Sequence, residues 1–209
     1  MAVRAIGNDD EEEKRMGNMN DIIVRKALKS DLDFLCEVFA NARRFMIVMG
    51  NPDEWGEHYP DLKQTKADIA AGHCYIIEDD KNSVLGTFCV IEEDDPAYSG
   101  IRNGRWLNDD AYVVLTRVAA TGYHGSTADA ILSWCAGQYP NIRTETHRLN
   151  MSMRSALMRA GYKLCGVVER EGREPLLAFH KQPVVVKVQS DDDLAHEADE
   201  DIETEGAEV

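Results

Sequence analysis

The sequence predicts a mixed α/β (α+β) fold in a single domain. Residues 111–136 give the first indication, because a β-branched apolar run is followed there by a glycine-containing loop and then by apolar residues at helical spacing. The second is the order of predicted elements: strand, two helices, three strands, helix, strand, helix, two strands. The third is the length of 209 residues, which is enough for one domain with a real core.

Short apolar and β-branched runs between turn residues predict the strands. They cover residues 21–27, 73–78, 83–91, 112–118, 141–146, 163–169 and 175–180. Gly86 interrupts the third run, which is expected at a bulge or where another backbone comes very close. The Asp79-Asp80-Lys81-Asn82 turn joins the second strand to the third.

Capping residues and apolar stripes predict the helices. Candidate N-caps are Ser30, Asp61 and Asn150, and the helix after Ser30 extends towards Met46 or Val48. Glycines that end these helices are Gly50, Gly72 and Gly161. The remaining helix carries the apolar stripe Ala128, Ile131, Leu132 and Cys135.

The acidity of the chain lies in its two ends. The net charge is −15, but ten acidic residues and no Lys or Arg follow Lys187, and residues 1–20 hold five acids and three bases. Without these ends the middle carries a net charge of only −3. We therefore expect disordered acidic tails at 1–20 and 183–209 around one domain at 21–182.

This balance excludes several classes of function. A nearly neutral domain argues against nucleic-acid binding, which relies on Lys and Arg at phosphates. No apolar run reaches the roughly 20 residues that span a bilayer, and we expect no membrane partner and a cytoplasmic protein. Five scattered cysteines indicate reduced thiols, and the six histidines show no metal-ligand spacing, so no metal is expected.

Three loops are candidates for function. Residues 51–61 are unusually aromatic, and they are read equally well as a lid over the core or as a substrate contact. Residues 92–110 form the longest irregular segment, and such loops in compact domains are often functional. The loop at 122–127 sits between a strand and a helix, where backbone N–H groups and the helix dipole can bind phosphate, although glycines there also serve simply to turn the chain.

Taken together, the element order and several short segments resemble the GNAT superfamily of N-acetyltransferases over residues 21–182. Those segments are Gly50-Asn51-Pro52 with Trp55 and Tyr59-Pro60, Asp95-Pro96-Ala97-Tyr98, Gly104-Arg105-Trp106-Leu107, Thr146-His147-Arg148-Leu149-Asn150 and Ala160-Gly161-Tyr162. The resemblance is to a bacterial, mostly uncharacterised branch. It implies a mixed, mostly antiparallel central sheet with helices on both faces, acetyl-CoA as cofactor and acyl transfer to an amine.

The resemblance also implies which residues contact the cofactor. The backbone of Val118, Ala119 and Ala120 would pair with the pantetheine arm as an added strand does. The loop Gly122, Tyr123, His124, Gly125, Ser126 and Thr127 would bind the pyrophosphate. Asn150 fits the family's asparagine beside the arm, and it is equally well a plain N-cap.

The sequence departs from the family pattern at two places. Of the loop positions Gly122, Gly125 and Thr127, only Gly125 matches the family's pattern of Gln or Arg, Gly, and Gly or Ala. Leu157 stands where many members carry the tyrosine that protonates the departing thiolate. Acetyl transfer would then need another proton donor or an unassisted thiolate.

Candidate catalytic groups follow from the chemistry. A substrate ammonium must lose a proton before it attacks, and a donor must face the developing oxyanion, for which we favour the amide of Val118 or Ala119. Glu92 and Glu93 are candidate bases, with solvated surface carboxylates as the alternative. His147 is the preferred acid or base, with a structural histidine as the alternative, and Glu145 lies in the same neighbourhood.

Four aromatic residues are candidates for the acceptor pocket: Trp55, Tyr59, Tyr98 and Trp106, with ordinary packing as the alternative for at least half of them. The expected partner is a small-molecule or peptide amine, and a homodimer stays open. The competing hypothesis is a non-catalytic acyl-CoA-binding regulator. It follows from Leu157, which stands where many members carry the proton-donating tyrosine. A toxin-like enzyme acting on charged tRNA is disfavoured by the neutral domain.

Overall fold

The computed structural model describes residues 22–92, 95–122, 126–170 and 174–183. Apart from Pro183, the two predicted acidic tails lie outside these residues, and so do Glu93 and the loop residues Tyr123, His124 and Gly125.

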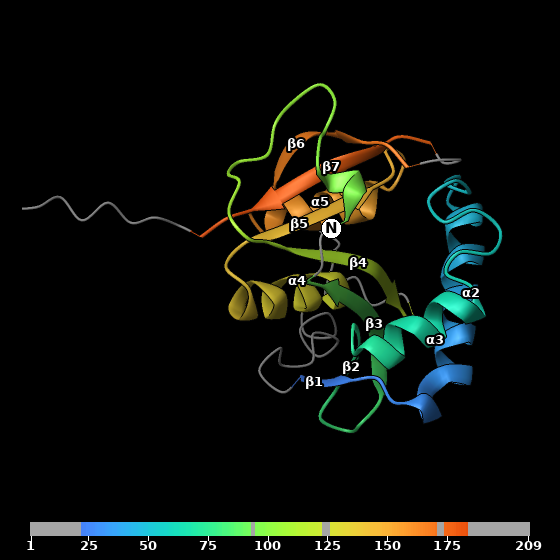
Figure 1. Ribbon diagram of the computed structural model, residues 1–209. Helices are drawn as coiled ribbons and strands as arrows, with labels where there is room; N and C mark the ends of the chain where they lie inside the picture. The colour runs from blue at the N-terminus through green and yellow to red at the C-terminus, as the bar shows by residue number, and fades with distance from the viewer. Residues whose placement is uncertain (1–21, 93–94, 123–125, 171–173, 184–209) are drawn as a thin grey trace, which may run out of the picture.

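A seven-stranded sheet forms the centre of the described chain, in the order β1-β2-β3-β4-β5-β7-β6 (Figure 1). The strands are β1 (Ile23–Lys26), β2 (Cys74–Glu78), β3 (Val84–Ile91), β4 (Val113–Ala120), β5 (Ile142–Thr146), β6 (Lys163–Val168) and β7 (Leu176–Lys181). Neighbours are antiparallel except β4 and β5, which are parallel. This confirms the predicted strands and the mostly antiparallel sheet.

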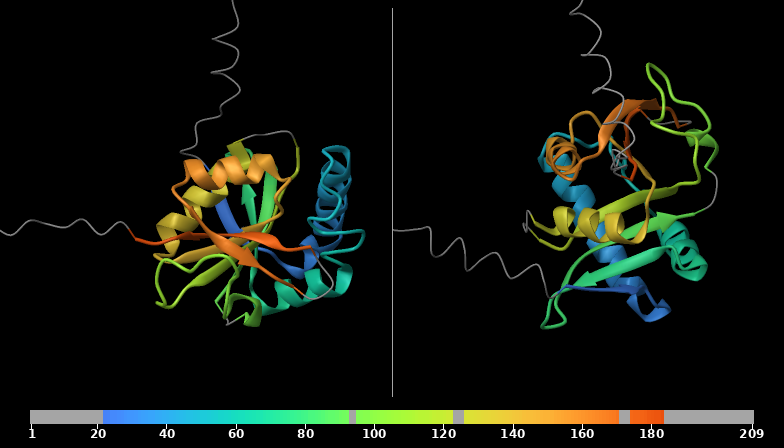
Figure 2. Two further views of the ribbon diagram at one scale, coloured as in Figure 1. Left: turned by 90° about the horizontal axis from the view of Figure 1, so that it is seen from above. Right: turned by 90° about the vertical axis from the view of Figure 1, so that its left-hand side faces the viewer.

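Helices cover both faces of the sheet, as predicted (Figure 2). They are α2 (Leu32–Val48), α3 (Leu62–Ala71), α4 (Ser126–Gln138) and α5 (Met151–Arg159), with short 3-10 helices at Lys29–Asp31 and Pro96–Tyr98. One core lies between the sheet and α4 and α5, and it includes Phe88, Leu115 and Ile131. A second core lies between the other face and α2 and α3, and it includes Phe39 and Ile76.

Most of the predicted caps are present. The Asp61 carboxylate accepts a hydrogen bond from the Gln64 amide at 2.7 Å, and Asn150 Oδ1 accepts one from the Met153 amide at 3.1 Å. Gly72 and Gly161 follow their helices with φ of 73° and 82°.

The prediction that Ser30 caps the first helix is wrong. Residues 29–31 form a 3-10 turn, and it is the Asp31 carboxylate that accepts a hydrogen bond from the Leu28 amide, at 2.7 Å. Arg25 of β1 holds this carboxylate through a contact of 2.8 Å, so the strand and the turn fix the start of the helix together. A charged partner on a neighbouring strand is not visible in the local capping pattern.

A β-bulge at Arg117 changes the direction of β4. Thr87 pairs with Ala119 and Cys89 with Thr116, so that two residues of β4 oppose Phe88 alone. Arg117 has a φ of 52°, a left-handed conformation that is uncommon for a residue with a side chain. Because of the extra residue, Ala119 packs into the core on the α2 side, whereas Leu115 faces the α4 side.

The parallel strands β4 and β5 stay together over a short distance only. Their paired residues end at Leu115 and Thr144, where the Thr144 hydroxyl donates to the Leu115 carbonyl at 2.8 Å. From Thr116 onwards, the β5-facing edge of β4 has no strand partner among the described residues. The separation of two adjacent parallel strands opens the sheet at this end.

His180 of β7 fastens the long loop before β4. Its Nδ1 accepts a hydrogen bond from the Leu107 amide at 3.1 Å, so the proton lies on Nε2, which donates to Asn141 Oδ1 at 2.6 Å. The ring is fully buried, and burial together with the nearby Arg143 charge lowers the pKa of His180 to about 4. A second ring proton would point at the Leu107 N–H group, so this arrangement requires neutral histidine.

This lowered pKa predicts an acid-sensitive fold. Between its ordinary value of 6.5 and the folded value of about 4, the unfolded chain binds the proton and the folded chain does not. The free energy of unfolding should therefore fall as the pH drops through this window, by on the order of 3 kcal/mol at most. Urea unfolding at pH 7 and pH 4.5 measures it, and His180→Gln should reduce the difference. Equal pH dependence in both proteins would contradict the prediction.

Candidate functional site

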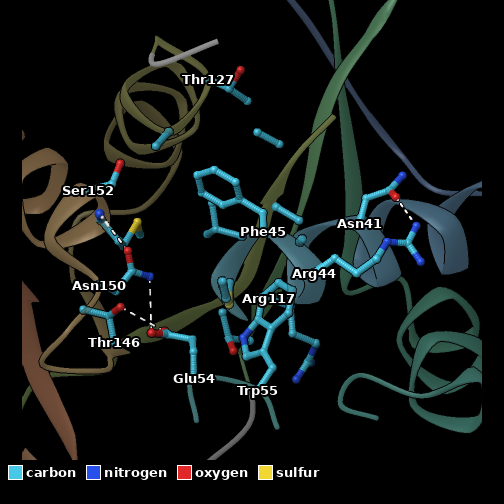
Figure 3. A pocket seen from close by; sticks show the side chains of 18 of the residues that line it. Asn41, Arg44, Phe45, Glu54, Trp55, Arg117, Thr127, Thr146, Asn150 and Ser152 are labelled. Atoms are coloured by element: carbon cyan, nitrogen blue, oxygen red, sulfur yellow. Dashed lines mark hydrogen bonds between the residues drawn. The ribbon is translucent and has the colours of Figure 1, made fainter. Parts of the chain in front are cut away.

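A cleft of about 610 Å³ opens where β4 and β5 separate (Figure 3). Its walls come from β4, β5, the starts of α4 and α5, the last turns of α2 and the loop at 54–59. The cleft thus joins the opened sheet edge to the aromatic loop that the sequence singled out.

Most of the predicted cofactor-binding residues that are described line one side of this cleft. They are Val118, Ala119, Ala120, Gly122, Thr127 and Asn150. Ser126 is the first residue of α4, and nothing is described of its side chain. The free edge of β4 and the first turn of α4 therefore meet in one cleft, which is the geometry that suits an extended arm followed by a phosphate.

Gly86 explains how this side is packed. A Cβ at residue 86 would lie 2.5 Å from the Ala119 carbonyl oxygen and 2.9 Å from Thr127 Cγ2. Any side chain there would push β4 or the start of α4 away. The glycine that the sequence marked as a close backbone approach is confirmed as such, and it lies directly behind the cleft.

Glu54 is a residue that the sequence interpretation missed. Its side chain is buried yet lines the cleft, and Oε1 accepts a hydrogen bond from the Thr146 hydroxyl at 2.9 Å. Oε2 accepts from the His147 amide at 3.0 Å and from the side chains of Asn51 at 2.9 Å and Asn150 at 3.2 Å. The carboxylate thereby ties the loop at 51–61 to the end of β5 and the start of α5 (Figure 3).

Asn150 has both of the roles that the sequence left open. Its Oδ1 caps α5 through the Met153 amide, while its Nδ2 donates to Glu54. The side chain lines the cleft in a fixed orientation, because both polar ends are held. The aromatic composition of the loop drew attention to 51–61, but no local pattern marked Glu54 as the partner of Asn150.

A buried ion pair holds the bulge of β4. Arg117 is 6 % exposed, and its Nη2 donates to Asp68 Oδ1 of α3 at 2.9 Å. Its Nη1 donates to the Tyr59 hydroxyl at 2.5 Å. Burial acts to lower the pKa of Arg117, but the side chains of Cys89, Tyr59 and Asp68 raise it above its ordinary value.

Two of the four predicted substrate-binding aromatics line the cleft, namely Trp55 and Tyr59. Tyr98 and Trp106 do not line it. They stack on each other with ring centres 5.4 Å apart, and the guanidinium of Arg143 lies 4.3 Å from the centre of the Trp106 ring. For this pair the structure favours the alternative of ordinary packing.

The two predicted catalytic residues that the structure describes, His147 and Glu92, do not line the cleft, and Glu93 lies outside the described residues. His147 is fully buried and is absent from the lining, and its Nε2 lies 2.9 Å from Glu174 Oε2. Glu92 follows the end of β3, where Ile91 pairs with Val114, and the cleft lies at the opposite end of β4. Their catalytic roles stay predictions, and the geometry gives them no contact with the cleft.

Glu145 does line the cleft, as part of an ionic cluster. Arg170 donates to it at 2.5 Å and to Asp95 at 2.8 Å. Burial, with Glu145 nearby, raises the pKa of the neighbouring Tyr98 well above its usual range. Leu157, at the position of the usual tyrosine, is fully buried in the α4-side core and supplies no proton donor.

No group of three or more His, Cys, Asp or Glu side chains among the described residues is arranged to hold a metal ion. Nor does any helix in the described ranges have the length and apolar character needed to cross a membrane.

Comparison with protein families gives no matching family model, and comparison with curated proteins gives no match. Solved structures do match. A GNAT-family acetyltransferase from Streptococcus agalactiae shares 26% identity over 77% of this chain and 95% of its own, with a TM-score of 0.71.

Two more distant structures share the fold. A GNAT-superfamily phosphinothricin acetyltransferase from Sinorhizobium meliloti, in complex with AcCoA, has 13% identity and a TM-score of 0.53 over 80% of this chain and 92% of its own. AAC(6')-Ib, in complex with Parmomycin and AcetylCoA, has 16% identity and a TM-score of 0.56 over 82% and 99%. The sheet, its parallel pair opened at β4 and these likenesses together show that the chain has the fold of the GNAT acetyltransferases.

Proposed function

We propose that the protein is an acetyl-CoA-dependent N-acetyltransferase that acetylates a primary amine of a small molecule or a peptide. One observation carries the proposal: the unpaired edge of β4 runs along the same cleft as the first turn of α4. Two structures with this fold contain acetyl-CoA, which supports the assignment of the cofactor.

The residues of the cleft suit this cofactor. The backbone of Val118, Ala119 and Ala120 offers hydrogen bonds to an extended arm, because no strand in the described part of the chain pairs with that edge of β4. The start of α4 offers N–H groups and a positive dipole end to phosphate. Thr127 Oγ1 is buried without a hydrogen-bond partner among the described residues, so it is a polar atom that a ligand in the cleft could satisfy.

Acetyl-CoA supplies an activated acetyl thioester. The amide groups beside the bulge at Arg117 are the donors that we assign to the oxyanion, since the bulge turns this part of β4 relative to β3. The carboxylates of Glu54 and Glu145 face the cleft where the acceptor amine would lose its proton. Amine attack forms the C–N bond, and the C–S bond breaks to release the thiolate.

A second candidate is a non-catalytic acyl-CoA-binding regulator. Leu157 favours it, because this buried leucine leaves the departing thiolate without the proton donor that many GNAT enzymes use. The two candidates differ in turnover and share cofactor binding.

A thioester assay separates them. We expect acetyl-CoA to raise the midpoint of thermal unfolding and a panel of primary amines to release free CoA, detected by thiol titration, above the rate without amine. Stabilisation without CoA release from any amine would support the regulator instead. Absence of both effects would contradict cofactor binding itself.

The buried ion pair predicts a second result. Asp68 lies on α3 and does not line the cleft, but it holds the guanidinium of Arg117 at the bulge. Asp68→Asn should cost about 3 kcal/mol of unfolding free energy, because it leaves the Arg117 charge without its buried counter-ion. It should also lower kcat, since the bulge donors lose their support. Glu169→Gln, which removes an exposed pair with Arg102, is the matched control. Unchanged kcat in Asp68→Asn would refute the positioning role.

The hydrogen bonds that the Glu54 carboxylate accepts, called the Glu54 clamp below, predict a third result. Glu54→Gln removes the negative charge that the His147 and Asn150 N–H donors share, and the amide can keep its oxygen toward them only by turning its NH2 group to the Thr146 hydroxyl, so this wall of the cleft is held less firmly. We expect kcat/KM for acetyl-CoA to fall by about tenfold to a hundredfold. Glu57→Gln changes an exposed carboxylate of the same loop and should leave steady-state kinetics unchanged. Equal effects of the two substitutions would disprove the clamp.

A further inference from the structure

The side of the cleft opposite the cofactor residues is formed by the last turns of α2. Phe45, Met46 and Val48 line it, together with Ala42 and Trp55. Figure 3 shows the Phe45 side chain reaching from α2 towards the middle of the cleft, between the side of Thr127 and Ser152 and the side of Asn41 and Arg44. Phe45 is 42 % exposed and Val48 is 80 % exposed, and apolar surface of this kind beside a cleft is typical of a ligand-binding site.

Polar groups are concentrated at the other end of this wall. The carboxylate of Glu54 lies at the end of β5, beside the cofactor residue Asn150. Arg117 also borders the cleft, but its guanidinium is already bound to Asp68 and to the Tyr59 hydroxyl. Arg44 lies at the α2 side, where its guanidinium contacts Asn41. The wall of α2 between these groups offers apolar surface and few hydrogen-bond partners.

We propose that the acceptor is a primary amine carried on an apolar, ring-sized body, such as an arylalkylamine, whose body packs on Phe45, Met46, Val48 and Trp55. This inference rests on the proposed function and specifies its substrate class. The ammonium group lies at the Glu54 end, because opposite charges attract in a partly buried site and the acetyl donor approaches from the same end. The body lies along α2 and covers the exposed apolar side chains.

Polyhydroxylated and polycationic acceptors fit this wall poorly. A sugar hydroxyl or a second ammonium placed against Phe45 and Val48 would lose its hydration without gaining a partner. A cleft of about 610 Å³ that also admits the cofactor arm leaves space for a small acceptor only. The apolar side chains of α2 and the carboxylate of Glu54 together favour an apolar amine, while Arg44 and Asn41 contact each other at the side of the cleft.

The test measures CoA release with acceptors of four classes: tryptamine and 2-phenylethylamine; spermidine; kanamycin; and the peptide triglycine. We expect the two arylalkylamines to have a kcat/KM at least about tenfold above the others, the factor expected from burial of one aromatic body. Higher efficiency with spermidine, kanamycin or triglycine would overturn the acceptor class and leave the proposed function intact. Release of CoA from none of them, with acetyl-CoA still bound, would instead refute the proposed function.

Two single substitutions on α2 sharpen the test. Phe45→Ala should raise the KM for tryptamine by about tenfold or more, with the KM for acetyl-CoA unchanged. Ile47→Ala is the matched control, because Ile47 is 54 % exposed on the same helix and does not line the cleft. A rise in the KM for acetyl-CoA alone would assign Phe45 to the cofactor and overturn the inference.

The same variants also test whether a second copy of the chain, and not an acceptor, covers the apolar side chains of α2. If a second copy of the chain covers α2, Phe45→Ala should lower the molar mass measured by light scattering and leave the KM for tryptamine unchanged. That result would overturn the inference. An unchanged mass with the raised KM supports it.

Discussion

The structure of the cleft depends on one strained residue, Arg117, and on the ion pair that keeps it in place. A side chain in the left-handed region costs on the order of 1 kcal/mol or more, so the surrounding contacts must favour it. Asp68 and the Tyr59 hydroxyl provide those contacts, from α3 and from the loop at 51–61. The extra residue at the bulge reverses which side chains of β4 point to each face of the sheet, so it decides which of them enter each core. The bulge also lies just beyond Leu115, the last residue of β4 that pairs with β5.

Glu54 complements this arrangement from the opposite wall. Arg117 ties the aromatic loop to β4, and Glu54 ties the same loop to the end of β5 and to Asn150. The loop therefore bridges the two strands at the place where their own hydrogen bonds stop. Where two strands of a sheet separate, their backbone N–H and C=O groups lose their partners in the sheet. Here side chains of the loop at 51–61 contact both strands at the point of separation.

Local sequence predicted the fold well and the site in part. Strands, most helix boundaries and the cap at Asn150 could be predicted, because each depends on neighbours in sequence. The glycine within β3 marked a close approach at Gly86, but not its partners, Ala119 and Thr127, which lie far along the chain. Glu54 and Asp68 could not, since their partners lie 92 and 49 residues away. The pattern around His147 was compatible with a catalytic role, but only the packing of β5 shows that the ring is buried behind the wall.

The close packing at Gly86 makes the two halves of the cleft differ in how well they tolerate substitution. The half along β4 is shaped in part by backbone atoms packed so closely that a Cβ at residue 86 would disturb them. The half along α2 presents side chains of one helix, among them Phe45 and Val48. Substitutions at a few positions of that helix would therefore change the surface that the proposed acceptor meets and leave the packing at Gly86 as it is.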